Sequence, residues 1–494
     1  MLFNSSIFLF QFLPAVIIGT LVLQRLAPGY VLHFLVGSSL FFYGWWSPRH
    51  LLLIAASIGF NFAMGRVISA TRSTALLGLA IAGNLGLLGY FKYYNLFALG
   101  VQVSGGSWTP FRDIVLPLAI SFFTFEQISY LVDCRNRTIG AAPFWEYMLF
   151  VCFFPKLIAG PIVRYGELTG QNFSSRLGVR AIDFAPGLTL LVLGLGKKVL
   201  LADQAALHVS PVFSAAAAGN DVGIVDAWVG VLAYTAQIYF DFSGYSDMAI
   251  GLALMLGLRL PLNFNSPYKS LSVIDFWRRW HVTLSRFLRD YLYIPMGGSQ
   301  RGTLRRYINL FVVMLLGGLW HGAGLTFVAW GLLHGFYLVI NHLFRDLTNR
   351  WAPASRFCHA AWCGACWALT YFSVVVAWVF FRADSLAAAF RLIGSMFGAA
   401  EQQIPLVSVQ TEAVVTVALL VALTLLAPNS NEIVRGCHLP VEAAHDATAR
   451  RHVEVRSGWM IWRPSVPWAV GIGAVFVSVL ASLSRPSPFL YFQF

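Results

Sequence analysis

The chain has 494 residues, of which 58% are hydrophobic and only 11% are charged. Ordinary soluble domains carry about 25% charged residues, so this composition excludes a soluble globular protein and indicates that much of the chain contacts lipid. The formal net charge of +13 does not indicate nucleic-acid binding, because no zinc-finger spacing and no basic DNA-reading segment accompanies it. We assign the excess of Lys and Arg to the connections between membrane segments.

Long apolar runs recur from one end of the chain to the other, including Phe8 to Leu23, Ala75 to Phe91 and Val414 to Leu426. A helix needs roughly 20 mostly apolar residues to cross the hydrocarbon core, and this rule predicts roughly ten to twelve membrane segments. Several runs are short or contain Gly and Pro, which favours broken or re-entrant segments. The first run has its first cation, Arg25, on its far side, so we interpret it as a retained crossing rather than a signal peptide. The predicted fold class is an all-α polytopic integral membrane protein.

The chain contains no internal repeat and no segment large enough for a soluble domain, so we expect one membrane domain over residues 1–494. The polar stretch from Asn429 to Arg463 is predicted to be a solvated loop before a last crossing near Trp468 to Leu483. Cys363 and Cys366 have CxxC spacing, but no second Cys pair or nearby His pair completes a set of metal ligands. We therefore expect no structural disulfide and no bound metal.

Lys and Arg are densest between Arg259 and Arg306, and the positive-inside rule places this region on the cytoplasmic side of the membrane. Within it, Asp275 to Ile294 interleaves apolar and basic residues at helical spacing, which predicts an interfacial helix. Its inward face would carry Trp277, His281, Leu284, Leu288 and Leu292. Basic side chains here could bind the phosphates of an acyl donor or, equally, lipid headgroups. The candidates for phosphate contacts are Lys269, Arg278, Arg279 and Arg286.

His321 is the leading candidate for a chemical role, because it interrupts two apolar runs within the sequence Gly317 to Gly324. Ionisable side chains are costly inside a membrane and are functional candidates for that reason. A packed, hydrogen-bonded histidine is an equally good interpretation from the residues alone. His334, thirteen positions later, has no polar neighbour in the sequence, and we interpret it as structural.

Two carboxylates and several hydroxyls interrupt the apolar stretch from Gln237 to Met248. Because lipid-facing acids would be costly, we expect Asp241 and Asp247 to face a cavity, a water path or a basic partner. A hydrogen bond that only locks neighbouring helices together is the alternative for each. Ser243 lies in the same stretch, but no G-x-S-x-G elbow indicates a serine nucleophile.

Several motifs together resemble the membrane-bound O-acyltransferase family, in its bacterial branch and its alginate O-acetyltransferase type. They are the run from Phe153 to Arg164, the stretch from Tyr239 to Gly251, Asn263 to Tyr268, Phe276 to His281, and Leu319 to Gly322. The resemblance implies a helical bundle with a central tunnel or funnel. It also implies that His321 is the catalytic histidine and that His281 is a second functional residue. We expect the tunnel to be lined by Asp241, Ser243, Asp247, Asn265, Tyr268, Trp277, Trp280 and Trp320.

The resemblance implies transfer of an acetyl group from a cytoplasmic thioester, acetyl-coenzyme A, toward an extracytoplasmic polysaccharide such as alginate, with His321 as general base. It further implies a bacterial inner-membrane location, a periplasmic partner that completes the transfer, and no permanently bound cofactor. Cellulose-like or peptidoglycan acceptors would fit equally well. Two alternatives stay open: D-alanyl transfer from a phosphopantetheine carrier to teichoic acid, and a transporter or flippase, since broken helices with buried acids also occur in transport proteins.

Overall fold

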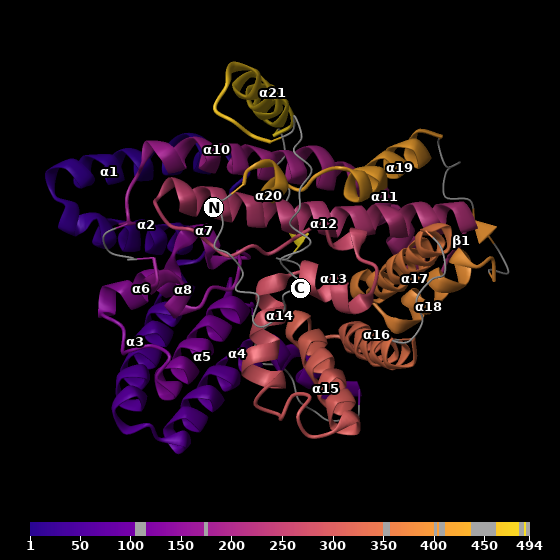
Figure 1. The fold of residues 1–494 in the computed structure, drawn as a ribbon, viewed down its shortest axis with the longest axis horizontal. Coiled ribbons are helices and arrows are strands. Elements are labelled where there is room, and N and C mark those ends of the chain that lie inside the picture. Colours follow the sequence, from indigo (N-terminus) through magenta and orange to yellow (C-terminus); the bar gives the residue numbers. More distant parts are fainter. Residues whose placement is uncertain are drawn as a thin grey trace. The chain divides into compact units, whose positions relative to one another are not determined.

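The computed structural model describes residues 1–103, 115–171, 176–348, 356–399, 403–404, 411–435, 461–483 and 489–490. Helices account for nearly all the regular structure in these ranges (Figure 1). One parallel pair of two-residue strands, β1 (Asp221–Val222) and β2 (Gln403–Ile404), is the exception. The described helices agree with the predicted all-α fold class.

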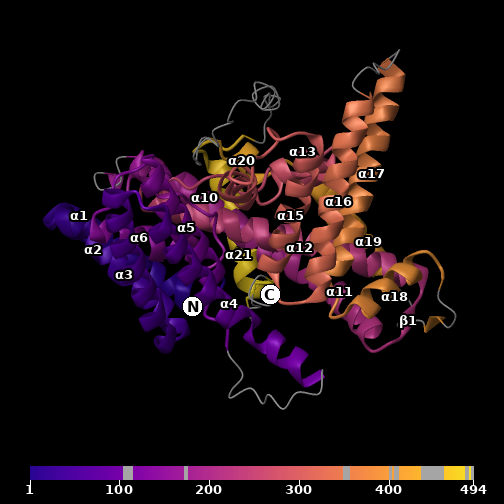
Figure 2. The same ribbon diagram turned by 90° about the horizontal axis from the view of Figure 1, so that it is seen from below.

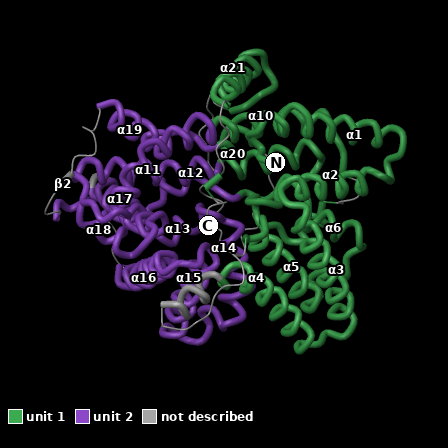
Figure 3. Tube along the Cα trace, turned by 180° about the vertical axis from the view of Figure 1, so that it is seen from behind, with its two compact units in different colours: residues 1–196, 244–262, 430–492 green, residues 197–243, 263–429, 493–494 purple. Residues whose placement is uncertain are grey.

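The chain forms two compact units, coloured separately in Figure 3. Unit 1 contains residues 1–196, 244–262 and 430–492, and unit 2 contains residues 197–243, 263–429 and 493–494. The long helix α12 (Ile224–Met255) contributes residues to both units. The prediction of a single membrane domain over residues 1–494 stays a prediction.

Unit 1 is built from the N-terminal helices and two C-terminal ones. These are η1 (Phe8–Phe12), α1 (Leu13–Leu26), η2 (Pro28–Tyr30), α2 (Val31–Trp46), α3 (Pro48–Thr71), α4 (Thr74–Val103), α5 (Ile120–Asn136), α6 (Phe144–Cys152), α7 (Phe154–Leu157), α8 (Tyr165–Thr169), α10 (Ala181–Gly196), α20 (Ser430–Ile433) and α21 (Val466–Ser482). Within unit 1, a buried ion pair between Glu126 of α5 and Lys156 of α7 joins these two helices. The second carboxylate oxygen of Glu126 accepts the Val163 N–H at 3.2 Å, so this carboxylate ties α5 to the segment after α7.

Unit 2 contains η3 (Lys197–Ala202), α11 (Asp203–Ala217), β1, η4 (Pro267–Lys269), α13 (Val273–Arg279), α14 (Val282–Leu288), η5 (Arg289–Tyr293), α15 (Thr303–His321), α16 (Leu325–Thr348), α17 (Arg356–Arg382), α18 (Leu386–Met396), β2 and α19 (Thr411–Leu426). Helices α16 and α17 run side by side, as Figure 2 shows, and α15 packs along α16. The short helix α13 contacts both α16 and α17. Of the two predicted catalytic histidines, His321 ends α15 and His281 lies in the break between α13 and α14.

Six helices in the described residues are long and apolar enough to cross a membrane. They are Phe8–Leu26, Pro48–Thr71, Thr74–Tyr94, Ala181–Ala217, Leu325–Thr348 and Cys358–Arg382. Three shorter apolar helices, α18, α19 and α21, accompany them. The chain is therefore a multi-pass membrane protein, as predicted, and the predicted total of ten to twelve segments stays a prediction.

The segment from Asp275 to Ile294 is not one interfacial helix, and that prediction is wrong. The helix ends at Arg279, and His281 adopts a left-handed conformation with φ of 42°, which few residues other than glycine tolerate. Two backbone hydrogen bonds to a distant segment hold the break: Asn265 N–H donates to Arg279 O, and Val282 N–H donates to Asn263 O, both at 2.9 Å. Long-range pairing thus overrides the helical periodicity.

The stretch from Asn429 to Arg463 also differs from its predicted solvated loop at its start. Asn429 and Ser430 are buried. In unit 2 the Asn429 amide donates to Asn265 Oδ1 and to Ser266 Oγ, at 3.1 and 2.9 Å. These bonds explain the burial of a polar side chain, because its donors are satisfied inside the protein. Residues 436–460 of the predicted loop lie outside the described residues.

Candidate functional site

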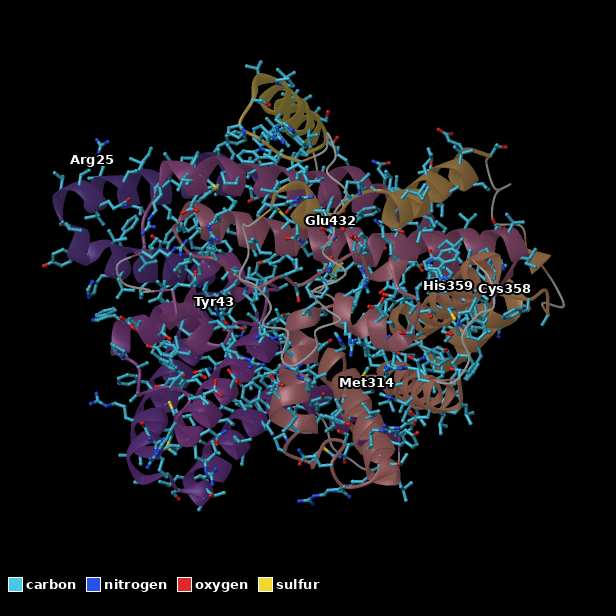
Figure 4. The ribbon with its side chains drawn as sticks, in the orientation of Figure 1. Arg25, Tyr43, Met314, Cys358, His359 and Glu432 are labelled. Carbon is cyan, nitrogen blue, oxygen red and sulfur yellow. The ribbon has the colours of Figure 1, made fainter. Side chains whose placement is uncertain are left out.

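Helices α15 and α16 approach each other backbone to backbone, and this contact sets the position of His321. A Cβ atom on Gly331 would lie 2.5 Å from the carbonyl oxygen of Met314, a residue labelled in Figure 4. A Cβ atom on Gly318 would lie 2.3 Å from Phe327 O. Both distances are shorter than any real Cβ contact, so only glycine allows this packing, as in other membrane helices with small residues at their interface.

His321 is the last residue of α15 and is buried. Its ring lies against three aromatic rings, with centroid distances of 4.9 Å to Trp320, 5.1 Å to Trp330 and 5.1 Å to Phe381. Glycine follows His321, and a Cβ on Gly322 would lie 2.1 Å from the Phe327 ring, so a larger residue here would require that ring to shift. In the sequence Trp320-His321-Gly322, the imidazole therefore lies among aromatic rings at the end of a helix.

His281 is fully buried and is held by Asn263. The distance from His281 Nδ1 to Asn263 Oδ1 is 3.0 Å, and the same oxygen accepts the Thr283 hydroxyl at 2.9 Å. An amide oxygen can only accept, so His281 Nδ1 carries the proton in this hydrogen bond and the neutral ring keeps its lone pair on Nε2. His281 lies outside the six candidate spans, and burial lowers the pKa of its imidazole well below the ordinary value. The ring is therefore neutral at pH 7.

The two predicted catalytic histidines meet at one indole ring. The ring of His281 lies 6.3 Å from that of Trp320, and the ring of Trp320 lies 4.9 Å from that of His321. Phe242 also packs edge-on against His281 at 4.8 Å. The structure thus brings His281, Trp320 and His321 together, while their catalytic roles stay predictions.

Three further predicted tunnel residues join the same unit 2 cluster. The Trp277 indole N–H donates to His334 Nδ1 at 3.3 Å. The Trp280 ring lies 4.9 Å from that of Trp378. The Tyr268 hydroxyl donates to Thr235 O at 2.7 Å and accepts from the Trp378 indole at 3.1 Å. The Tyr268 hydroxyl therefore both donates and accepts a hydrogen bond within the chain.

Asp241 has a basic partner, one of the three surroundings predicted for it. Its carboxylate accepts from Lys198 at 2.7 Å, and Lys198 also pairs with Asp203 at 2.9 Å. Lys198 lies in the π-helical turn η3, a distortion that often marks functional sites. Sequence reasoning missed Lys198, although two lysines between apolar runs were a visible signal. Ser243, two residues after Asp241, is buried, and its Oγ has no hydrogen-bond partner among the described residues.

Asp247 belongs to unit 1, where its carboxylate accepts a hydrogen bond from the buried Ser430 hydroxyl. Asn265 belongs to unit 2, where its side chain accepts from Asn429. For both residues the structure supplies polar partners within the chain. Their predicted place along a tunnel stays a prediction.

The predicted phosphate-binding cations differ in their surroundings. Lys269 Nζ donates to Ala427 O at 2.7 Å, and Arg279 Nε lies 3.0 Å from the Asp275 carboxylate. Arg278 is exposed, and Arg286 is half-buried. Arg278 is therefore the most accessible of these cations, while phosphate binding by any of them stays a prediction.

Sequence reasoning also missed several residues that complete the surroundings of the histidines. They are Asn263, Thr283, Trp330 and Phe381, and His334, which was interpreted as structural, lies beside Trp330. Trp330 and His334 are four residues apart and therefore lie on one face of α16, a spacing visible in the sequence. Asn263 was within a quoted motif, but only the fold reveals that it meets His281.

Comparison with known proteins agrees with this arrangement of residues. Residues 71–381 match the membrane-bound O-acyltransferase family. A peptidoglycan O-acetyltransferase from Helicobacter pylori is 41% identical over 81% of this chain and 80% of its own. A protein named probable alginate O-acetylase from Pseudomonas putida is 39% identical over 100% of both chains. A teichoic acid D-alanyltransferase from Bacillus subtilis is more distant, at 25% identity over 50% of this chain and 65% of its own.

The matched region contains α5 to α16, both histidines and their aromatic neighbours from Phe242 to Phe381. The buried His321 at the end of α15 and the Asn263-bound His281 fall inside it. With this match and with relatives near 40% identity over most of their length, the chain belongs to the membrane-bound O-acyltransferase family and is an acyltransferase.

Proposed function

We propose that this acyltransferase takes an acetyl group from acetyl-coenzyme A in the cytoplasm and transfers it toward an extracytoplasmic polysaccharide at the bacterial inner membrane. The names of two relatives, at 41% and 39% identity, support acetyl as the group and a polysaccharide as the acceptor. The density of Lys and Arg between Arg259 and Arg306 supports donor entry from the cytoplasmic side. A periplasmic protein that passes acetyl to the polymer is part of this proposal.

The observation that carries the proposal is the buried pair of histidines whose rings both lie near the Trp320 ring. In the proposed reaction, the His321 imidazole removes the proton of the acceptor hydroxyl as its oxygen attacks the thioester carbonyl carbon. The carbon–sulfur bond then breaks, and the leaving thiolate takes the proton from His321. The products are the acetyl ester and free coenzyme A.

His281 has two possible roles, to orient His321 or to donate a hydrogen bond to the thioester carbonyl, and its hydrogen bond to Asn263 favours the first. A neutral His281 that donates from Nδ1 to Asn263 has no second N–H to offer the thioester carbonyl. We therefore propose that His281 is a positioning residue, which holds Trp320 and through it the ring of His321. Another group must then bind the carbonyl oxygen.

The test of the donor uses the purified chain in proteoliposomes. Acetyl-coenzyme A labelled in its acetyl group is supplied on one side, and D-alanyl carrier protein is supplied in a parallel sample. We expect consumption of acetyl-coenzyme A and release of free thiol that depends on an acceptor, with vesicles lacking the protein as control. Consumption of the D-alanyl thioester alone would favour the alternative supported by the distant D-alanyltransferase relative.

The same samples separate an enzyme from a transporter, the other alternative. A transporter would move a substrate across the vesicle membrane without breaking the thioester bond. Membership of an acyltransferase family supports turnover of the thioester. Net transport without thioester cleavage would overturn the proposal.

A further inference from the structure

Two side chains with buried ring N–H groups, Trp330 and His334, lie on one face of α16, and the first of them contacts His321. Trp330 and His334 are four residues apart, both are fully buried, and their ring centroids are 4.9 Å apart. The Trp330 ring also lies 5.1 Å from the His321 ring. The Trp330 side chain therefore contacts the proposed base, and the His334 side chain contacts Trp330.

The tautomer of His334 follows from its hydrogen bond to Trp277. An indole nitrogen can only donate, so the 3.3 Å bond from Trp277 Nε1 to His334 Nδ1 requires a lone pair on Nδ1. His334 is then a neutral imidazole with its proton on Nε2. The Phe276 ring lies nearly parallel to the His334 ring, with an interplanar angle of 10° and a centroid distance of 6.1 Å.

Neither His334 Nε2 nor Trp330 Nε1 has a hydrogen-bond acceptor among the described residues. A buried donor without an acceptor is unfavourable, so two adjacent ones point to an acceptor supplied from outside the chain. A trapped water needs two to four polar partners. The ring neighbours of His334 are aromatic: Phe276, Trp277, Trp330, Tyr337 and Trp378. An oxygen carried on an organic ligand would satisfy both donors without the further polar partners that a water needs.

We propose that Trp330 Nε1–H and His334 Nε2–H bind the carbonyl oxygen of the acyl thioester. This inference rests on the proposed function. When the acceptor oxygen attacks the carbonyl carbon, the carbonyl electron pair moves onto the oxygen, and the two N–H groups stabilise the resulting oxyanion. The pair returns as the carbon–sulfur bond breaks. These two N–H groups would donate hydrogen bonds to the carbonyl oxygen, which neutral His281 cannot do because its N–H is used by Asn263.

Variants of His334 separate the donor role from a structural one. His334→Asn keeps an oxygen able to accept from Trp277 but removes the Nε2–H, whereas His334→Gln can return an N–H near that position. We expect kcat to fall about 100-fold in His334→Asn with KM nearly unchanged, and we expect partial recovery in His334→Gln. Trp330→Phe, which keeps a ring and removes the N–H, should lower kcat similarly. Full activity in both His334→Asn and Trp330→Phe would overturn the inference.

A binding measurement does not depend on turnover by the variants. The probe is a ketone analogue of acetyl-coenzyme A in which a methylene group separates sulfur from a ¹³C-labelled carbonyl. We expect its carbonyl stretch to shift to lower frequency on binding the unaltered protein, and less so on binding Trp330→Phe. An unshifted stretch in the unaltered protein would mean that these donors do not bind the carbonyl oxygen and would overturn the inference. If acetyl-coenzyme A is not consumed at all, the proposed function itself fails.

Discussion

Asn263 fixes the tautomer of His281, because its amide oxygen accepts the imidazole Nδ1–H without adding a charge. Burial then disfavours the imidazolium and keeps the pKa of His281 low. The acid limb of the pH–rate profile of the unaltered protein should therefore reflect the pKa of another group of the site, and not that of His281.

Asn263→Asp tests this relation. A carboxylate beside Nδ1–H stabilises the imidazolium, so it should raise the pKa of His281 by about one to three units. If transfer needs neutral His281, the acid limb of kcat/KM moves to higher pH, and activity near pH 6 falls more than activity near pH 8. Profiles of kcat/KM against pH measure the shift.

Thr283→Val is the matched control, because it removes the other side chain that donates to Asn263 Oδ1 but leaves His281 in place. Its profile should keep the acid limb of the unaltered protein. An unchanged acid limb in Asn263→Asp, in a protein that still folds and turns over, would contradict the assigned role of Asn263.

At the scale of elements, the close pairing of α15 and α16 depends on glycine at their contact. Gly331→Ala places a Cβ 2.5 Å from the Met314 carbonyl oxygen, which is backbone and cannot rotate away. Such overpacking costs about 1–3 kcal/mol, so the variant should unfold at a lower temperature and lose transfer activity as His321 shifts. Thermal unfolding in detergent, followed by thiol labelling, measures the first effect.

Gly364→Ala on α17 is the matched control, because nothing lies within 4 Å of the Cβ that it adds. It should leave both the unfolding temperature and the activity nearly unchanged. Equal stability of Gly331→Ala and Gly364→Ala would contradict the close backbone contact between α15 and α16.

The elements differ in how much of them the sequence could predict. The apolar runs near Phe8 and Ala75 predicted spanning helices that the structure confirms as candidate spans, since length and hydropathy are local properties. The break at His281 could not be predicted, because backbone bonds to Asn263 and Asn265 create it from a distance. The same holds for the ion pair of Asp241 with Lys198, which joins residues 43 positions apart.

The candidate site was predicted in part. The motifs around His281 and His321 identified two side chains that the fold then brings to one indole, Trp320. His334 was interpreted as structural, because its sequence neighbours are apolar and its polar partner, the Trp277 indole, lies on another helix. The hydrogen-bond partners of a lone histidine in an apolar run come from other helices, so they cannot be predicted from its local sequence.

At the scale of the whole molecule, family membership and composition both indicate a membrane protein. The family match covers residues 71–381, and the full-length relative from Pseudomonas putida aligns over the entire chain. Six candidate spans embed the chain in a membrane. The acyl transfer proposed for this chain requires that His321, enclosed by aromatic rings, acts on a substrate hydroxyl within that membrane-embedded protein.

The most direct measurement is the initial rate of acetyl transfer from acetyl-coenzyme A by His321→Ala in proteoliposomes at saturating donor. General-base assistance typically contributes about 10² to 10⁴ in rate, so we predict a fall of at least about 100-fold, with binding of the ketone analogue retained. His359→Ala, at an exposed histidine of α17 labelled in Figure 4, is the control and should keep the rate of the unaltered protein. A His321→Ala rate within a few-fold of that of His359→Ala would contradict the assignment of His321 as the base.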